Sequence, residues 1–227
     1  MVFMNLNSNT ANQSRSALRR QREREQRYRT ILNAAAQLFA RKGYHRTSME
    51  KIADRAEVSV GTVYFYFKNK EDLLVQMIDE FGFQLRNRLG AEFRDADGSM
   101  EGFKKAGQIF FEDFCPRDPD KVAILFRESA GQSALVEKHR KKIFNKLIDD
   151  VKQALHRMQA NLGIQYQSHL SAEVMAVSIM GMFERIAYHY LIWHDRPDEL
   201  EIIGQDAMDF IVGGINNLSQ TETKHQE

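Results

Sequence analysis

Apolar residues recur with helical spacing along most of the chain. From about Arg22 they return every three or four positions as far as Phe39, and Gly43 should end this helix, since glycine readily adopts the left-handed backbone that follows a helix. The same period continues from Leu73 to about Phe93. Further helices are expected, between prolines and glycines, at 99–114, 119–129, 133–161, 171–194 and 197–217. No segment alternates convincingly as a strand does, so an all-α fold is predicted.

Two short helices are expected between the first and the next long one. Thr47 and Glu50 have the spacing of a capping box, which predicts a helix over about 48–56. Ser59 should cap a third helix over 60–65, and Asn69 should cap the long helix that follows. Two short helices joined by a tight turn, after a longer one, indicate a three-helix helix-turn-helix unit.

Charge is distributed unevenly along the chain. Residues 1–70 hold 14 lysines and arginines against 5 aspartates and glutamates, a net charge of +9, which leaves −8 for residues 71–227 because the whole chain carries +1. A basic N-terminal region on an acidic body is typical of a nucleic-acid-binding head, although a solvated basic face alone would look the same.

Other compositional features narrow the class of protein. The single cysteine, Cys115, cannot form an internal disulfide and fits a reducing cytoplasm, and no apolar stretch reaches the length of a membrane span. We expect neither a bound metal nor a cofactor, since the histidines lack metal-site spacing: His189 and His194 are five residues apart and do not share a helix face. Ser129 and Ser133 lack the strand-turn-helix setting of a catalytic nucleophile, so no enzymatic activity is expected.

Residues at the start of the third helix suit contact with DNA. Val60, Gly61 and Thr62 are short or polar, as a backbone close to the major groove requires. Tyr64 and Tyr66 have hydroxyl groups that reach phosphate oxygens.

The runs TSMEKIA at 47–53 and GTVYFYFKNKEDLL at 61–74 resemble the DNA-binding domain of the TetR family of transcriptional repressors. The resemblance covers about residues 25–75. It implies that Ser48 and Lys70 contact phosphate, that 60–62 face the major groove, and that the three aromatics 64–66 touch base edges or backbone. Phe65 is apolar where many members carry a polar, histidine or tryptophan side chain, so it would meet a thymine methyl. Core packing stays an alternative for Phe65, Tyr66 and Phe67.

Residues 1–20 are rich in polar residues and lack an apolar period, which predicts a disordered basic arm whose arginines could touch phosphate or the minor groove. With the resemblance, the expected organisation continues with the helix-turn-helix domain at 21–70, a larger helical domain for ligand binding and dimerisation at 71–218, and a disordered tail at 219–227. The last two predicted helices are apolar over much of their circumference and would form a homodimer interface. A two-fold dimer would place two recognition helices on palindromic double-stranded operator DNA.

An effector site is expected among aromatic, methionine and basic residues of the larger domain. The candidates are Phe103, Phe110, Phe111, Phe114, Phe126, Arg127, Phe144, Met175, Met182, Phe183, Arg185, His189 and Tyr190. Ordinary core packing is the alternative for each, and pairing with Glu128 or Glu184 is the alternative for the arginines. An apolar pocket with one cation would suit a fatty acid, an acyl thioester or an aromatic acid. We therefore expect a repressor released from its operator by a small apolar or acidic effector; an activator or a ligand-free architectural DNA-binding protein is the alternative.

Overall fold

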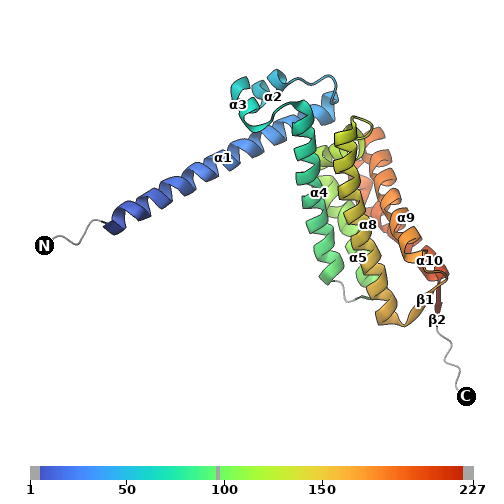
Figure 1. Ribbon diagram of the computed structural model, residues 1–227. Helices are drawn as coiled ribbons and strands as arrows, with labels where there is room; N and C mark the ends of the chain where they lie inside the picture. Colours follow the sequence, from blue (N-terminus) through green and yellow to red (C-terminus); the bar gives the residue numbers. More distant parts are fainter. Residues whose placement is uncertain (1–5, 96–97, 222–227) are drawn as a thin grey trace, which may run out of the picture. The chain divides into compact units, whose positions relative to one another are not determined.

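The computed structural model describes residues 6–95 and 98–221, and these residues are almost entirely helical (Figure 1). This confirms the all-α fold expected from the spacing of apolar residues. The chain divides into two compact units, Met1–Leu73 and Leu74–Glu227, called here the N-terminal and the C-terminal unit. Among the residues described, no helix is long and apolar enough to cross a membrane.

The first helix of the N-terminal unit, α1 (Leu6–Lys42), begins well before the start predicted near Arg22. The predicted disordered arm 1–20 is thus helical from Leu6 onward, and residues 1–5 lie outside the described part. The segment contains neither proline nor glycine and is rich in arginine, glutamine and glutamate, which favour helix although they give no apolar period. Pairs at i,i+4 support it, such as Arg29 with Glu25 at 2.8 Å.

Helices α2 (Met49–Arg55) and α3 (Val60–Tyr66) lie beside the C-terminal half of α1 (Figure 1). The cap of α2 is Ser48, whose Oγ accepts from the amide of Lys51, and not Thr47 as the capping-box pattern predicted. The Thr47 hydroxyl is buried and donates to the carbonyl of Gly43 at 3.0 Å, so it fastens the preceding turn. The expected cap of α3 is confirmed: the Ser59 Oγ accepts from the Thr62 amide at 3.1 Å.

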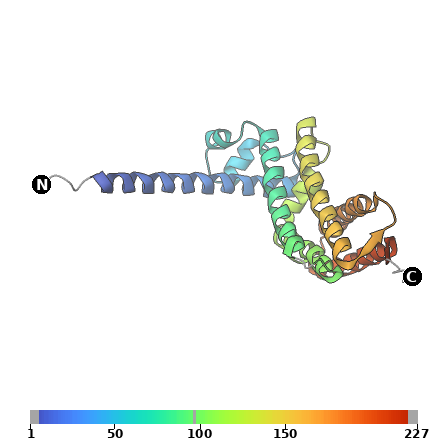
Figure 2. The same cartoon turned by 60° about the horizontal axis from the view of Figure 1, so that its bottom comes forward.

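Within its described residues, the C-terminal unit has five longer helices. Short helical segments lie between some of them, and the helices pack side by side (Figure 2). α8 lies along α9, and α10 packs on α5 and on the segment that follows it. The longer helices are α4 (Lys70–Asp95, which starts within the N-terminal unit), α5 (Met100–Ile109), α8 (Ala134–Leu162), α9 (Ser171–Ala187) and α10 (Leu200–Leu218). The short ones are α6 (Cys115–Arg117), α7 (Pro119–Ala123), the 3-10 turn η4 (Pro197–Glu199) and three π-helical segments, η1 (Phe110–Phe114), η2 (Ile124–Glu128) and η3 (Tyr188–Trp193).

Two short strands depart from the sequence-based prediction. β1 (Ile164–Tyr166) pairs antiparallel with β2 (Ser219–Thr221), and Gln165 lies opposite Gln220. Each strand has three residues, too few for a period of two to be recognised, and β2 lies where a disordered tail was predicted. Gly163, with a φ of 62°, ends α8 and turns the chain into β1. Residues 222–227 lie outside the described part.

The core of the C-terminal unit is an aromatic cluster sealed by close helix contacts. Phe110 stacks on Phe183 with ring centroids 5.0 Å apart. A Cβ added at Gly204 of α10 would lie 2.6 Å from the Cβ of Phe111, so only glycine permits this approach. Cys115 is buried and forms no disulfide, and burial raises the pKa of its thiol.

Candidate DNA-binding surface and effector site

Helix α3 has one buried and one exposed face. Val63 and, just after the helix, Phe67 are fully buried, whereas Phe65 is 69% exposed and Tyr64 is 49% exposed. Core packing therefore accounts for Phe67 and not for Phe65. Two aromatic side chains held in solvent are characteristic of a surface that binds a partner.

A hollow of about 370 Å³ adjoins this exposed face. Four residues that were predicted to bind DNA line this hollow: Gly61, Thr62, Phe65 and Tyr66. Ser59 and Arg27 complete its lining. Arg27 comes from α1 and was not predicted from the sequence, because it precedes the apolar period that marked the unit. Ser59 and Thr62 hold each other through their hydroxyl oxygens, 2.7 Å apart. Polar groups and a cation thus surround a concave surface at the start of α3, next to half-buried Val60.

The remaining predicted DNA contacts have partners within the N-terminal unit. The Tyr66 hydroxyl donates to the carbonyl of Arg24 at 3.2 Å, and the Ser48 hydroxyl caps α2. The Lys70 ammonium donates to the carbonyls of Tyr44 and Thr47, each at 3.0 Å. An ammonium has three N–H groups, so a phosphate contact by Lys70 would use the third.

The residues predicted for an effector site fall into two groups. Six of the phenylalanines meet in one cluster, supplied by η1, η2, α8 and α9: Phe110, Phe111, Phe114, Phe126, Phe144 and Phe183. All except half-buried Phe144 are buried. Phe103 lies apart from this cluster, packed against Phe93 at 5.2 Å between ring centroids.

A cavity of about 610 Å³ opens beside the cluster. Its lining consists of Phe126, Gly181, Glu184, Arg185, Tyr188 and Trp193. Only Phe126 and Arg185 were predicted. Tyr188 and Trp193 escaped because η3, which carries them, has no regular apolar period. Gly181 and Glu184 of α9 escaped because the search considered aromatic, methionine and basic residues. The Arg185 guanidinium lies 5.8 Å from the Tyr188 ring centroid and 5.6 Å from that of Trp193. An exposed cation is thereby held against two aromatic rings that line the same cavity.

The other predicted effector residues lie outside this lining. Arg127 pairs with Glu128 at 2.5 Å, which is the structural alternative that the sequence left open. Glu184 pairs with Arg140 at 3.1 Å and not with Arg185. His189 and Tyr190 contact each other through their rings, Met175 is buried, and Met182 is half-buried.

Helices α9 and α10 present apolar side chains to solvent. Val174 and Val177 of α9 are at least half exposed, as are Ile202 and Phe210 of α10, and Phe210 reaches 72%. A Cβ added at Gly181, Gly213 or Gly214 would meet nothing within 4 Å. The two helices predicted as a dimer interface thus carry an uncovered apolar face within the structure described.

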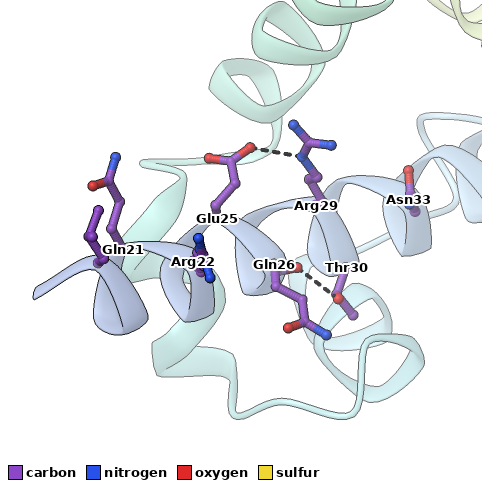
Figure 3. A pocket seen from close by; sticks show the side chains of 8 residues that line it. Gln21, Arg22, Glu25, Gln26, Arg29, Thr30 and Asn33 are labelled. Atoms are coloured by element: carbon purple, nitrogen blue, oxygen red, sulfur yellow. Dashed lines mark hydrogen bonds and ion pairs between the residues drawn. The ribbon is translucent and has the colours of Figure 1, made fainter. Parts of the chain in front are cut away.

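A third hollow, of about 630 Å³, runs along α1 and is lined by none of the predicted residues (Figure 3). Two of its polar side chains pair with each other, Arg29 with Glu25, and the Thr30 hydroxyl donates to the backbone carbonyl of Gln26. The described residues include no group of three histidine, cysteine, aspartate or glutamate side chains able to hold a metal ion.

A capped helix-turn-helix with an exposed aromatic and polar recognition surface, joined to a larger all-α unit, defines a DNA-binding transcriptional regulator. Residues 31–77 match the family model described as "Bacterial regulatory proteins, tetR family". The chain belongs to the TetR family of bacterial transcriptional regulators.

Known relatives match over nearly their whole length. The chain is 26% identical over 202 residues to the "Fatty acid metabolism regulator protein" of Bacillus subtilis (strain 168), covering 86% of this chain and 99% of that one. It is 24% identical over 200 residues to the "HTH-type transcriptional activator FasR" of Mycolicibacterium smegmatis, covering 88% of each. These relatives are regulators and not enzymes.

Solved structures share the fold. FadR from Bacillus subtilis in complex with stearoyl-CoA superposes with a TM-score of 0.73 at 22% identity, covering 82% of this chain and 98% of that one. AibR in complex with isovaleryl coenzyme A and operator DNA gives 0.65 at 22% identity, covering 83% and 97%.

Proposed function

We propose that this regulator is a homodimeric repressor released from a palindromic operator by an amphipathic acyl effector, a long-chain fatty acid or its acyl thioester. The observation that carries the proposal is that one cavity is lined by both an exposed cation and a buried aromatic ring. Arg185 is the exposed cation, and the buried Phe126 ring also belongs to the phenylalanine cluster, with its centroid 6.1 Å from that of Phe110.

The chemistry of the cavity matches an effector with one charged and one apolar end. A carboxylate or a phosphate group would pair with the Arg185 guanidinium, which is not engaged by Glu184 because that carboxylate pairs with Arg140. An acyl chain would then extend toward Phe126 and the cluster behind it. The volume of about 610 Å³ lies within the range of small-molecule sites.

The helices around the cluster offer a way to admit such a chain. Segments η1, η2 and η3 are π-helical and supply Phe110, Phe126 and Tyr188. Single π-helical turns are frequent at functional sites, since their wider winding permits a shift of register at small cost. Among the proteins named above, one is named a fatty acid metabolism regulator and two structures contain an acyl-CoA, which supports the same effector class.

Dimerisation through α9 and α10 would cover the exposed apolar face and place two recognition helices on one duplex. Release then follows from linkage between two conformations of the dimer, one that binds the operator and one that does not. An effector that binds the second conformation more tightly lowers operator affinity by the difference between its two binding free energies. We place this activity in the cytoplasm, with the chromosomal DNA.

The test is a thermal-shift titration of the purified chain with stearoyl-CoA, stearate and isovaleryl-CoA, followed by release of DNA selected from a random duplex library. An effector at about 1,000 times its Kd should stabilise the protein by about 4 kcal/mol and release the DNA. Arg185→Gln should weaken effector binding about tenfold, as expected for removal of one charge-assisted hydrogen bond. Lys142→Gln, which removes an exposed charge from α8, is the matched control and should bind as the unaltered chain does.

Each unfavourable outcome has a definite meaning. Stabilisation without any change for Arg185→Gln would place the effector elsewhere. Tighter DNA binding in the presence of the effector would make the protein an effector-dependent DNA binder, as an activator would be. An absence of stabilisation by all three compounds would reject the acyl effector.

A further inference from the structure

Three arginines form one stripe on α1, ahead of the residues that match the family model. Arg20, Arg24 and Arg27 are spaced i, i+4 and i+7, so they share one helix face, and all three are exposed. The match to the family model begins at residue 31 and so does not include these side chains, and among the three only Arg20 belongs to the arm whose arginines were predicted to touch DNA.

The arginine stripe is continuous with the recognition surface. The Arg24 guanidinium lies 5.6 Å from the centroid of the Phe65 ring, and Arg27 lines the same hollow as Thr62. The Tyr66 hydroxyl also donates to the backbone carbonyl of Arg24. Below them, Tyr28 stacks on Phe67 with ring centroids 5.4 Å apart, which fixes the rotation of α1 against α3. The stripe is therefore held at a defined place beside α3.

The carboxylates of α1 leave this face uncompensated. Glu23 pairs with Arg19 at 3.3 Å, and Glu25 pairs with Arg29 on the face shown in Figure 3. None of the three stripe arginines forms an ion pair within residues 6–95 and 98–221. Because both of these carboxylates pair with arginines outside the stripe, the three stripe arginines give α1 a face that attracts a polyanion.

We propose that the arginine stripe binds the phosphate backbone of duplex DNA next to the bases contacted by α3, and so extends each operator half-site on one side. This rests on the DNA-binding function proposed above. Arg20 and Arg27 are separated by about 10 Å along the helix axis, from a rise of ~1.5 Å per residue, which matches three nucleotides of one strand at ~3.4 Å each. Arginine suits this role because its planar fork contacts two phosphate oxygens at once.

The stripe acts on affinity and register and not on base preference. Phosphate contacts carry no sequence information, so their removal should weaken binding equally for all sequences. Arg24 has a second effect, since its stacking restrains the exposed ring of Phe65 in the position from which it faces a base.

The experiment uses the full chain and DNA selected by it from a random duplex library, in two lengths: the half-sites alone, and the same duplex with added flanks of mixed sequence. Dissociation constants are measured between 50 and 200 mM salt for Arg20→Ala, Arg24→Ala, Arg27→Ala and the triple variant. The slope of log K against log salt should become shallower by about 0.9 for each phosphate that is no longer neutralised, hence by about 2 for one substitution present in both subunits. The additional affinity for the flanked duplex should disappear in the triple variant.

Arg19→Ala and Arg29→Ala provide matched controls, because they remove the same charge from paired positions of the same helix. Circular dichroism and thermal melting are measured for every variant to check that α1 is retained. Stripe variants that bind both duplexes with the slope of these controls would overturn the proposal while leaving DNA binding intact. If the unaltered chain selects no DNA, the proposed function fails and the stripe proposal fails with it.

Discussion

The ammonium group of Lys70 donates a hydrogen bond of 3.0 Å to the carbonyl of Thr47, and a second bond of equal length joins it to the carbonyl of Tyr44. Lys70 also lies over the Tyr44 ring, 4.4 Å from its centroid. It thereby ties the first turn of α4 to the turn that precedes α2. These contacts remove part of the ammonium group from water, and this partial burial lowers the pKa of Lys70.

Replacing Lys70 by methionine should therefore destabilise the helix-turn-helix. Two carbonyls would be left without a charged donor, and hydrogen bonds to charged groups contribute about 1.5–3 kcal/mol each when shielded, less where water replaces them. We expect a decrease of about 1–2 kcal/mol in the free energy of unfolding, measured by urea denaturation. Lys68→Met, an exposed lysine nearby, should change it little. A Lys70→Met chain of unchanged stability, with only a shallower salt dependence of DNA binding, would instead assign Lys70 to phosphate.

Phe65 and Phe67 form a matched pair with opposite environments. Phe67 has no exposed surface, so Phe67→Ala should destabilise the protein by about 3–5 kcal/mol. Phe65 projects into solvent, and Phe65→Ala should change the free energy of unfolding by less than about 0.5 kcal/mol while weakening binding to selected DNA about tenfold. Urea denaturation and DNA titration on the same two variants separate these effects. A large decrease in stability for Phe65→Ala would show that the ring is part of the core.

Two glycines of α10 should respond in opposite ways to alanine. The new methyl group of Gly204→Ala would collide with Phe111, and overpacking of this kind costs about 1–3 kcal/mol. Gly213 has open space around it within a single chain and helical backbone, so Gly213→Ala should stabilise the separated monomer by about 0.5–1 kcal/mol through helix propensity. Thermal melting at one fixed protein concentration compares them. Equal melting temperatures would mean that α5, η1 and α10 separate readily.

The exposed apolar face of α9 and α10 predicts how the dimer can be broken. Phe210→Glu should place a charge in a buried interface and shift the chain to monomer at micromolar concentration, as followed by analytical ultracentrifugation. Phe83→Glu is the control, because Phe83 is also exposed but belongs to α4. Dissociation caused by Phe83→Glu, with Phe210→Glu still dimeric, would move the interface away from α9 and α10.

Tyr166 links stability to alkaline pH. Its hydroxyl donates to the carbonyl of Leu155 at 2.8 Å, and burial raises its pKa to about 12 from the ordinary value of 10. The folded state favours the protonated phenol, so Tyr166 contributes fully to the free energy of unfolding below pH 10. This contribution is lost between pH 10 and 12. We expect a decrease of about 1 kcal/mol, because solvent partly screens the hydroxyl. Tyr166→Phe should flatten this part of the stability–pH curve. Tyr64→Phe, which removes an exposed hydroxyl, should leave the curve as it is.

The sequence predicted those parts of the structure that depend on local pattern. The long helices α4, α5, α8, α9 and α10 follow from apolar periods of three and four, and the caps Ser59 and Asn69 follow from side chains that accept from amides three residues on. The prediction was wrong for the cap of α2, where Thr47 and Ser48 are neighbouring candidates. Thr47 was predicted as the cap, but its buried hydroxyl donates to the carbonyl of Gly43, and Ser48 caps the helix. Helix α1 began too late in the prediction, because the residues of its first half favour helix by their intrinsic propensity and show no apolar period.

The candidate sites depended on contacts between distant segments and were predicted less completely. Arg27 joins Thr62 only because α1 and α3 pack through Tyr28 and Phe67, a contact between residues 39 positions apart. Trp193 reaches the cavity of Arg185 through a π-helical turn, which sets it off the regular period. Arg127, by contrast, has an ion-pair partner next to it in the sequence, and this simpler alternative is the one found.

The burial of Cys115 has a practical consequence for following the protein in motion. It is the chain's single cysteine, and its raised pKa keeps the thiol protonated and poorly nucleophilic at neutral pH. The native chain should therefore react very slowly with maleimide reagents. A cysteine introduced at an exposed position, as in Arg41→Cys at the end of α1, would therefore carry the only fluorophore or spin label in each subunit. In a dimer, the distance between the two labels would report the spacing of the two DNA-binding heads, with and without an acyl compound.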